Sequence, residues 1–268
     1  MLLVIFGAGA SYDSAPSCRP GQHSGVEYRP PLANQLFEER ENFAVALTRF
    51  KRCQPIVPDL RHLAPDQNLE QVLERLRAQA EHYAEARRQL LAVQWYLQFT
   101  LWDIDNNWET VHRGVTNYKT LLNQIEPLRK RGQRVCLVTF NYDRMLDSAM
   151  PTVGVKIAEL KDYVANEAYK VIKVHGSVNW ARLVESPFTM TPGDDPYQRI
   201  EKLIDNAPDL KIRQSFQYIH SHPTSQVTVT PYIPALAIPV ETKTDSNFEC
   251  PQEHLEALRA FLPEVKKI

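Results

Sequence analysis

Three short apolar runs, each followed at once by glycine or polar residues, constrain the fold of this chain more than any other feature. The runs cover residues 2–6, 135–140 and 171–174, and each is short enough to form a buried strand. In an open α/β sheet, the residues at the carboxyl ends of parallel strands line the ligand crevice. The pattern therefore predicts an α/β fold with a Rossmann-like parallel sheet, in which three strand ends meet at one site.

The long stretch between the first two runs has the periodicity of helices. Asn68 and Gln71 have the spacing of a capping box, and apolar residues follow at helical intervals. Trp95, Tyr96 and Phe99 are interpreted as interhelical core rather than as a surface for stacking bases. Helices are expected over four stretches: 33–49, 68 onward, 85–100 and 118–128. We therefore predict a helical insertion, a lobe at about 33–131.

The remaining segments give weaker patterns. The proline- and glycine-bearing stretch 14–32 is expected to form a loop over the site. After Trp180 we expect a partly helical segment at 194–207, a strand at 226–230, a helix at 253–262 and the start of a strand at 265–268. The whole chain, 1–268, is interpreted as a single domain, and the last segment leaves open whether its final βα unit is cut short.

Bulk composition excludes several functional classes. The formal net charge of the 268 residues is −1, so no overall basic field indicates a nucleic-acid partner. No apolar stretch approaches the ~20 residues that cross a bilayer, and residues 1–6 are too short for a signal-peptide core. We expect a cytoplasmic protein without membrane contact or direct nucleic-acid binding.

Cysteine and histidine spacing gives little support for a metal site. The cysteines are far apart and form no Cys-x-x-Cys pair: Cys18, Cys53, Cys136 and Cys250. His220 lies near His222, and Cys250 and His254 share helical spacing, but neither pair has the further ligands of a zinc site. We therefore expect no metal, and we interpret Cys136, inside an apolar run, as a core residue.

The first glycine segment has the chemistry of a phosphate-binding turn. Gly7 and Gly9 follow a predicted strand and would let the backbone approach a pyrophosphate closely. The dehydrogenase fingerprint requires a third glycine where this chain has Tyr12, and the residue at the spacing of its ribose-binding acid, Glu27, lies in the predicted loop. An ordinary dehydrogenase is therefore disfavoured, and a glycine turn without a ligand stays an alternative.

The other two strand ends carry candidate catalytic groups. Asn141 follows a buried strand, where its amide needs a partner, and Asp143 has the position of a helix cap. Both therefore have a structural as well as a functional interpretation. His175 precedes a glycine at the mouth of the expected crevice, and an imidazole that titrates near neutrality is a natural general base.

Together these motifs resemble the sirtuin superfamily. The segments that carry the resemblance are Gly7-Ala8-Gly9 with Ser11, Thr139-Phe140-Asn141-Tyr142-Asp143 and Lys173-Val174-His175-Gly176-Ser177-Val178-Asn179-Trp180. Their fuller forms are most similar to the sirtuin-like NAD hydrolases of bacterial antiviral defence, as are residues 29–32 and 234–239. The likeness covers residues 2 to about 262, but the two cysteine pairs that bind zinc in sirtuin deacylases are absent.

The resemblance implies a role for each matching residue. Gly7, Ala8, Gly9 and Ser11 would hold the pyrophosphate of NAD, and Ser177 would belong to the same cofactor-binding set. Asn141 would position a water or a ribose hydroxyl at the reacting carbon. Asp143 would contact the nicotinamide carboxamide, and His175 would act as the base. Asn141→Ala or His175→Ala is then expected to leave folding intact and to abolish turnover.

The implied activity is hydrolysis of NAD⁺ at the nicotinamide–ribose bond, giving ADP-ribose or a cyclic form. In the family this reaction depletes NAD in infected cells, often together with an Argonaute-like, nuclease or ATPase partner, and we expect a homo-oligomer. An accessory domain that is active only when assembled with such a partner is one alternative. A second alternative is a module that senses NAD or ADP-ribose without turnover. NAD-dependent protein deacylation is a third alternative, which the missing zinc cysteines disfavour.

Overall fold

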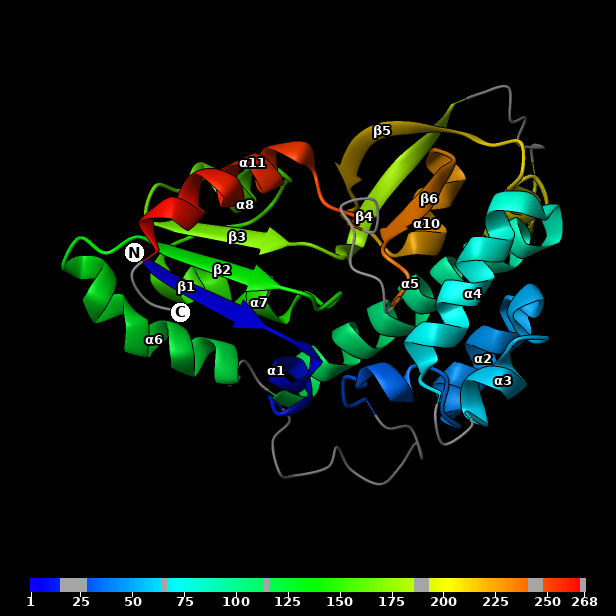
Figure 1. Ribbon diagram of the computed structural model, residues 1–268, viewed down its shortest axis with the longest axis horizontal. Coiled ribbons are helices and arrows are strands. Elements are labelled where there is room, and N and C mark those ends of the chain that lie inside the picture. Colours follow the sequence, from blue (N-terminus) through cyan, green and yellow to red (C-terminus); the bar gives the residue numbers. More distant parts are fainter. Residues whose placement is uncertain (15–27, 64–66, 113–115, 186–192, 241–247, 266–268) are drawn as a thin grey trace.

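The computed structural model describes residues 1–14, 28–63, 67–112, 116–185, 193–240 and 248–265. Three parallel strands, β1 (Leu2–Phe6), β2 (Val135–Thr139) and β3 (Tyr169–Lys173), form sheet A in the order β1-β2-β3. The prediction of three parallel strands is confirmed: β1 has the predicted boundaries, and those of β2 and β3 differ by one or two residues. Phe6 pairs with Thr139, and Thr139 pairs with Lys173, so the three carboxyl ends lie side by side (Figure 1).

Helices cover both faces of sheet A, which explains why its strands are apolar runs rather than alternating ones. All five residues of β2 are buried. On one face Leu137 packs in a cluster with α6 (Asn117–Lys130) and α7 (Met145–Ala149). On the other face Cys136, a core residue as predicted, packs in a cluster with α11 (Gln252–Phe261). The short α8 (Asp162–Ala165) lies against β3.

The helices from Glu41 to His112 form a helical lobe that ends before the predicted limit of about 131, because α6 packs on sheet A, and it has one break that the sequence pattern did not show. It consists of α2 (Glu41–Arg49), α3 (Val57–Arg61), α4 (Leu69–His82) and α5 (Ala84–His112), with 3-10 turns at Ala33–Gln35 and Lys51–Cys53. The helix expected over 33–49 is therefore wrong in its first part, which forms a single 3-10 turn.

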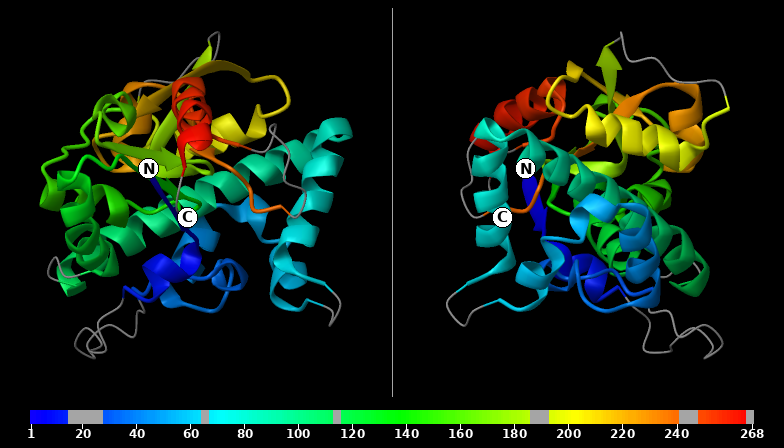
Figure 2. Two further views of the ribbon diagram at one scale, coloured as in Figure 1. Left: turned by 60° about the vertical axis from the view of Figure 1, so that its left-hand side comes forward. Right: turned by 90° about the vertical axis from the view of Figure 1, so that its right-hand side faces the viewer.

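Two predictions within the helical lobe are confirmed in detail. Asn68 caps α4 by accepting a hydrogen bond from the Gln71 amide at 2.9 Å, and the Gln71 side chain accepts one in return from the Asn68 amide at 3.2 Å. On α5, Trp95 and Tyr96 are fully buried and belong to the core, as expected, whereas Phe99 is only partly buried and packs against that core. Figure 2 shows α5 crossing the molecule from the lobe toward sheet A. None of the helices in the described ranges is both long enough and apolar enough to span a bilayer.

A second sheet, which the sequence analysis did not identify, lies beside sheet A. Strands β4 (Gly176–Glu185), β5 (Lys211–Tyr218) and β6 (Tyr232–Leu236) are antiparallel in the order β5-β4-β6. The predicted helix at 194–207 is confirmed as α9 (Pro196–Asp205), and the predicted helix at 253–262 is confirmed as α11. The arrangement is thus a mixed α/β fold whose sheet A is compatible with a Rossmann-like sheet.

The strand expected at 226–230 is wrong, because most of that segment belongs to the helix α10 (Pro223–Val229). His222 caps the helix by accepting a hydrogen bond from the Thr224 amide, and Pro223 occupies a favourable first-turn position. Local capping therefore outweighs the strand preference of the β-branched residues. The strand start expected at 265–268 and most of the loop expected at 14–32 lie outside the described residues.

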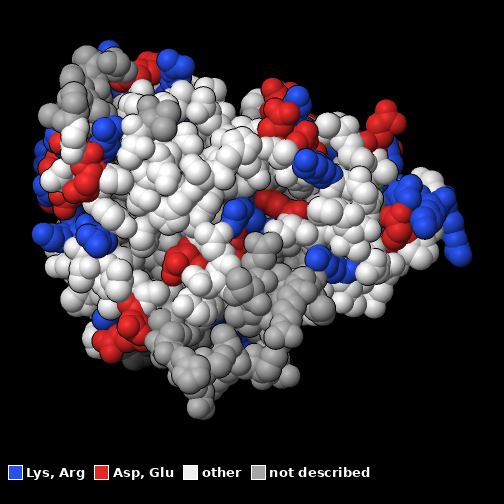
Figure 3. All heavy atoms as spheres, turned by 180° about the vertical axis from the view of Figure 1, so that it is seen from behind, with Lys and Arg blue, Asp and Glu red and all other residues white. Residues whose placement is uncertain are grey.

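On the face opposite to that of Figure 1, charged side chains of both signs lie mostly toward the edges, beside a broad area that carries few charges (Figure 3). Exposed ion pairs of the described residues include Arg52 with Asp205 at 2.6 Å and Arg134 with Glu264 at 2.5 Å. Exposed pairs of this kind add little stability, so the fold depends chiefly on the apolar clusters.

Candidate functional site

A pocket of about 340 Å³ opens at the carboxyl ends of the strands of sheet A, and we call it the strand-end pocket. The sheet contributes the turn after β1, the segment after β2 and His175 after β3, while the opposite wall comes from the helical lobe. The lining residues are Gly7, Ala8, Ser11, Pro30, Pro31, Ala33, Leu36, Glu70, Leu101, Ile104, Phe140, Asn141, Tyr142, Asp143, His175 and Pro239. Six of the eight residues proposed from the sequence therefore line one pocket.

The turn after β1 brings Gly7, which has no side chain, to the wall of this pocket. Gly7 precedes the five-residue helix α1 (Ala8–Tyr12) with φ −108°, so its conformation does not require glycine. A Cβ atom on Gly7 or on Gly9 would meet no atom within 4 Å. Packing does not require glycine at either position, and Gly7 leaves room for a ligand at the pocket wall. Gly9 is exposed and lies outside the pocket lining.

Asn141 connects the ends of two strands. Its side chain is 6 % exposed, and Nδ2 lies 2.9 Å from the carbonyl oxygen of Gly7, 2.9 Å from Ser11 Oγ and 2.8 Å from the Tyr118 hydroxyl. An amide nitrogen has two hydrogens to share among these acceptors. All the hydrogen bonds of this side chain to described residues use Nδ2, and the residue lines the strand-end pocket. Both interpretations of Asn141, structural and functional, therefore have support.

Ser11 and Asp143 extend the same network. The Ser11 hydroxyl donates to Asp143 Oδ2 at 2.6 Å and lies 2.8 Å from the Tyr118 hydroxyl, and Ser11 is only 2 % exposed. Burial, and after it the negative charge of Asp143, raises the pKa of Tyr118, so this phenol stays protonated and can act as a donor. One hydrogen-bond network therefore joins helix α1, helix α6 and the end of β2. Its four side chains are Ser11, Tyr118, Asn141 and Asp143.

Two ion pairs with buried carboxylates fix the position of the segment after β2. Lys173, fully buried on β3, donates a hydrogen bond to the carbonyl oxygen of Asp143, and its Nζ lies 3.6 Å from Asp147 Oδ2. Arg144 Nε donates to Asp105 Oδ2 at 2.6 Å. Burial of Asp105 raises its pKa to about 6, although Arg144 acts in the opposite direction. These contacts fix the backbone that carries Asn141 and Asp143.

His175 lies in the turn between β3 and β4 and is half-buried. Its ring packs edge-on against Phe140, with centroids 5.0 Å apart, and nearly parallel to Tyr142 at 6.3 Å. Its backbone oxygen accepts a hydrogen bond from the Ala237 amide at 2.9 Å. The next residue, Gly176, has φ +80°, and a Cβ there would lie 1.9 Å from the Ala235 carbonyl oxygen. This tight crossing of β4 and β6 sets the position of His175.

Ser177, proposed as a cofactor-binding residue, does not line the pocket. It is fully buried, and its hydroxyl donates to the Tyr142 carbonyl oxygen at 3.2 Å. The structure therefore places Ser177 behind the site, where it supports the backbone of Tyr142 rather than facing a ligand.

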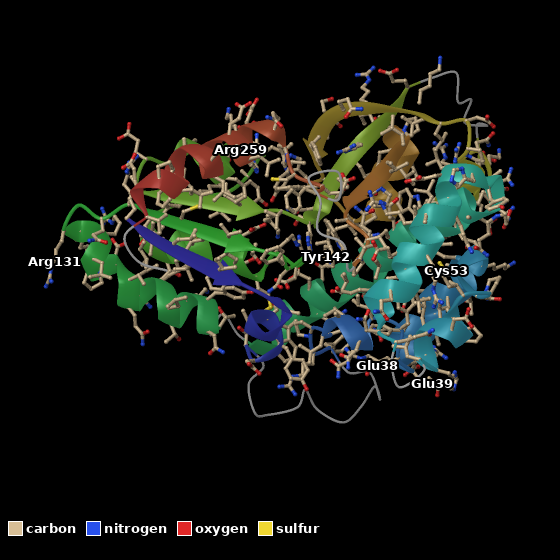
Figure 4. All side chains as sticks on the ribbon, viewed as in Figure 1. Glu38, Glu39, Cys53, Arg131, Tyr142 and Arg259 are labelled. Atoms are coloured by element: carbon tan, nitrogen blue, oxygen red, sulfur yellow. The ribbon has the colours of Figure 1, made fainter. Side chains whose placement is uncertain are left out.

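Several lining residues were not proposed as site residues from the sequence. Tyr142 lies between the strand ends and the helical lobe (Figure 4), and its hydroxyl donates to the Ala237 carbonyl oxygen at 2.8 Å. Burial, with a smaller contribution from the charge of Glu70, raises the pKa of Tyr142. Glu70, on α4, is half-buried and also lines the pocket. In the sequence, the one feature that distinguishes Glu70 is its place in the first turn of a capped helix.

Two of the histidines considered for zinc have other partners. His222 caps α10, and His254 Nε2 lies 2.9 Å from the Leu160 carbonyl oxygen, where burial lowers the pKa of its ring. Within the described residues, no three His, Cys, Asp or Glu side chains gather closely enough to hold a metal ion.

No family model matches the chain, and no curated protein sequence matches it either.

Proposed function

We propose that the chain is an NAD⁺ hydrolase that cleaves the bond between nicotinamide and ribose. The observation that carries the proposal is the convergence of Gly7, Asn141, Asp143 and His175 on one pocket at the ends of three parallel strands. The resemblance of the same segments to sirtuin-like NAD hydrolases supports it. The pocket volume is within the range of small-ligand sites.

The chemistry of this bond suits the side chains present. Nicotinamide leaves NAD⁺ as a neutral molecule from a cationic ring, so the cleavage needs no strong general acid. The ribose carbon gains positive character, and an oriented nucleophile lowers the barrier. In this proposal Asn141 Oδ1 orients a water or a ribose hydroxyl, and His175 accepts the proton that the nucleophile loses. Asp143 would contact the nicotinamide carboxamide.

Gly7, Ala8 and Ser11 would face the phosphate side of the substrate. The hydroxyl of Ser11 is committed to Asp143, so its contribution would be to hold the turn rather than to bind phosphate directly. The exposed backbone of Gly7 would allow the close approach that the sequence motif suggests.

The wider biological setting follows from the resemblance and is proposed with it. We propose a cytoplasmic antiviral effector that depletes NAD. It would act as a homo-oligomer or with an Argonaute-like, nuclease or ATPase partner, and without a metal.

One observation favours a second candidate, a module that binds NAD or ADP-ribose without turnover. Asn141 Nδ2 contacts three acceptors within the protein, and that set of contacts would also be expected of a purely structural asparagine. Such a module would use the same pocket but would release no nicotinamide.

Incubation of the purified chain with NAD⁺ tests the proposal. Nicotinamide and an ADP-ribose product should appear in equal amounts, without any acylated peptide. Nicotinamide release only in the presence of an acyl-lysine peptide would indicate a deacylase instead. Binding of NAD⁺ or ADP-ribose without any release would favour the sensing module.

A further inference from the structure

A buried lysine lies beside the strand-end pocket without lining it. Lys173, the last residue of β3, is 0 % exposed and precedes His175 by two positions in the sequence. A charged ammonium group that is removed from water is costly unless it is paired and hydrogen-bonded. Its place at the end of a strand that leads into the candidate site therefore requires an explanation beyond the packing of the sheet.

The side chain of Lys173 joins the ends of two strands. Its backbone pairs with Thr139 at the end of β2, and its Nζ donates a hydrogen bond to the carbonyl oxygen of Asp143, in the segment that follows β2. Asp143 and His175 both line the pocket, one after β2 and the other after β3. Lys173 thus ties the backbone of one lining residue to the strand that leads to the other.

The charge of Lys173 is balanced by a carboxylate outside the pocket lining. Asp147, on α7, is 8 % exposed, and its Oδ2 lies 3.6 Å from Lys173 Nζ and accepts a hydrogen bond from the Tyr163 hydroxyl at 2.6 Å. In a buried ion pair the cost of desolvation offsets much of the Coulombic gain, and uncharged side chains of similar size are often no less stable. Stability alone therefore does not account for the lysine.

We propose that Lys173 is a positioning residue that holds Asp143 at the nicotinamide end of the substrate. The proposal rests on the function proposed above, in which the Asp143 carboxylate contacts the nicotinamide carboxamide. Lys173 does not touch the substrate and acts through the Asp143 backbone. Both carboxylate oxygens of Asp143 already accept hydrogen bonds, from Ser11 and from the Met145 amide, so the side chain has little freedom to compensate for a shift of its backbone.

A purely structural role for Lys173 makes a different prediction. Stability would then account for every effect, and ligand binding would recover in any variant whose stability recovers. Lys173→Met alone leaves Asp147 buried and unpaired, so it should be strongly destabilised. Lys173→Met/Asp147→Asn removes both charges, keeps the net charge and nearly the size of the side chains, and leaves an oxygen for the Tyr163 hydroxyl. Chemical denaturation should show that this double variant is more stable than Lys173→Met.

The test measures binding of carba-NAD⁺ and of ADP-ribose by titration calorimetry. Carba-NAD⁺ has a methylene group in place of the ring oxygen of the nicotinamide ribose and is not hydrolysed, whereas ADP-ribose lacks the nicotinamide. The double variant should bind carba-NAD⁺ about tenfold more weakly than wild type and ADP-ribose with unchanged affinity.

Lys170→Met is the matched control. Lys170 lies on the same strand and donates a hydrogen bond to the Val164 carbonyl oxygen, and neither residue lines the pocket. The substitution removes the same side chain from the same kind of contact, so this variant should bind both ligands as wild type does.

Weaker binding of both ligands by the double variant, or of neither, would overturn the assignment, as would a wild type that binds neither ligand. A double variant that does not fold would also overturn it, because the lysine would then be required for stability itself. Nicotinamide release from NAD⁺ is measured separately on the same preparations. Release by wild type together with any of these results would remove only the role of Lys173. A selective loss of carba-NAD⁺ binding, without release by wild type, would support that role and reject the proposed hydrolysis.

Discussion

Asn141 and Gly7, 134 positions apart in the sequence, are joined by a 2.9 Å hydrogen bond from Asn141 Nδ2 to the Gly7 carbonyl oxygen. The bond fixes the end of β2 to the end of β1 at the wall of the strand-end pocket. It gives Asn141 a part in the fold as well as a place in the proposed site, and this double role changes what its substitution should do.

Asn141→Ala should lower the free energy of unfolding by about 2 kcal/mol, because buried acceptors lose their donor. From the sequence alone this variant was expected to leave folding intact, and the three contacts of Nδ2 revise that expectation. Chemical denaturation measures the change. Asn117→Ala is the control, since Asn117 makes an exposed hydrogen bond to the Asp13 carbonyl oxygen, and it should cost much less. Equal costs for the two variants would contradict the structural role of Asn141.

Gly7→Ala should leave stability within about 1 kcal/mol of wild type, because the added methyl group contacts no atom and the backbone is not left-handed. The methyl group would, however, occupy the open wall of the pocket. We therefore expect binding of NAD⁺ to weaken by about tenfold, measured by calorimetry. Gly9→Ala adds the same methyl group outside the pocket lining and should bind as wild type. Full affinity in Gly7→Ala would show that the ligand does not approach this turn.

Gly176→Ala should be strongly destabilising. Both Gly176 and Gly154 have a positive φ, at +80° and +76°, so alanine at either position costs about 1–2 kcal/mol of backbone strain. Only at Gly176 would the new Cβ also collide with the Ala235 carbonyl oxygen. Thermal unfolding should therefore show a larger loss for Gly176→Ala than for Gly154→Ala. Similar losses would mean that β4 and β6 can separate without cost.

Local sequence signals predicted the strand ends well. Each strand of sheet A is a short apolar run, and the residues that follow it were identified because the carboxyl ends of parallel strands line the ligand crevice of an α/β sheet. The capping box at Asn68 was equally local and is confirmed. These features depend on residues that are close together in the sequence, so one sequence is enough to predict them.

The missed features depend on contacts between distant segments. The antiparallel sheet pairs β4 with β5 and β6 across long stretches of chain, and its strands have no regular alternation of exposed and buried residues. Glu70 has the spacing of a surface residue on α4, and only the approach of the helical lobe to sheet A brings it to the pocket. Ser177 lies within a site motif, yet the path of β4 takes it behind the pocket.

The most direct test of the account is nicotinamide release from NAD⁺ by wild type, His175→Ala and His62→Ala. His62 is exposed and lies outside the strand-end pocket, so its replacement controls for the loss of an imidazole. The account predicts release by wild type and His62→Ala, and a loss of about 100-fold or more in His175→Ala with an unchanged unfolding midpoint. Undiminished release by a folded His175→Ala protein would contradict it.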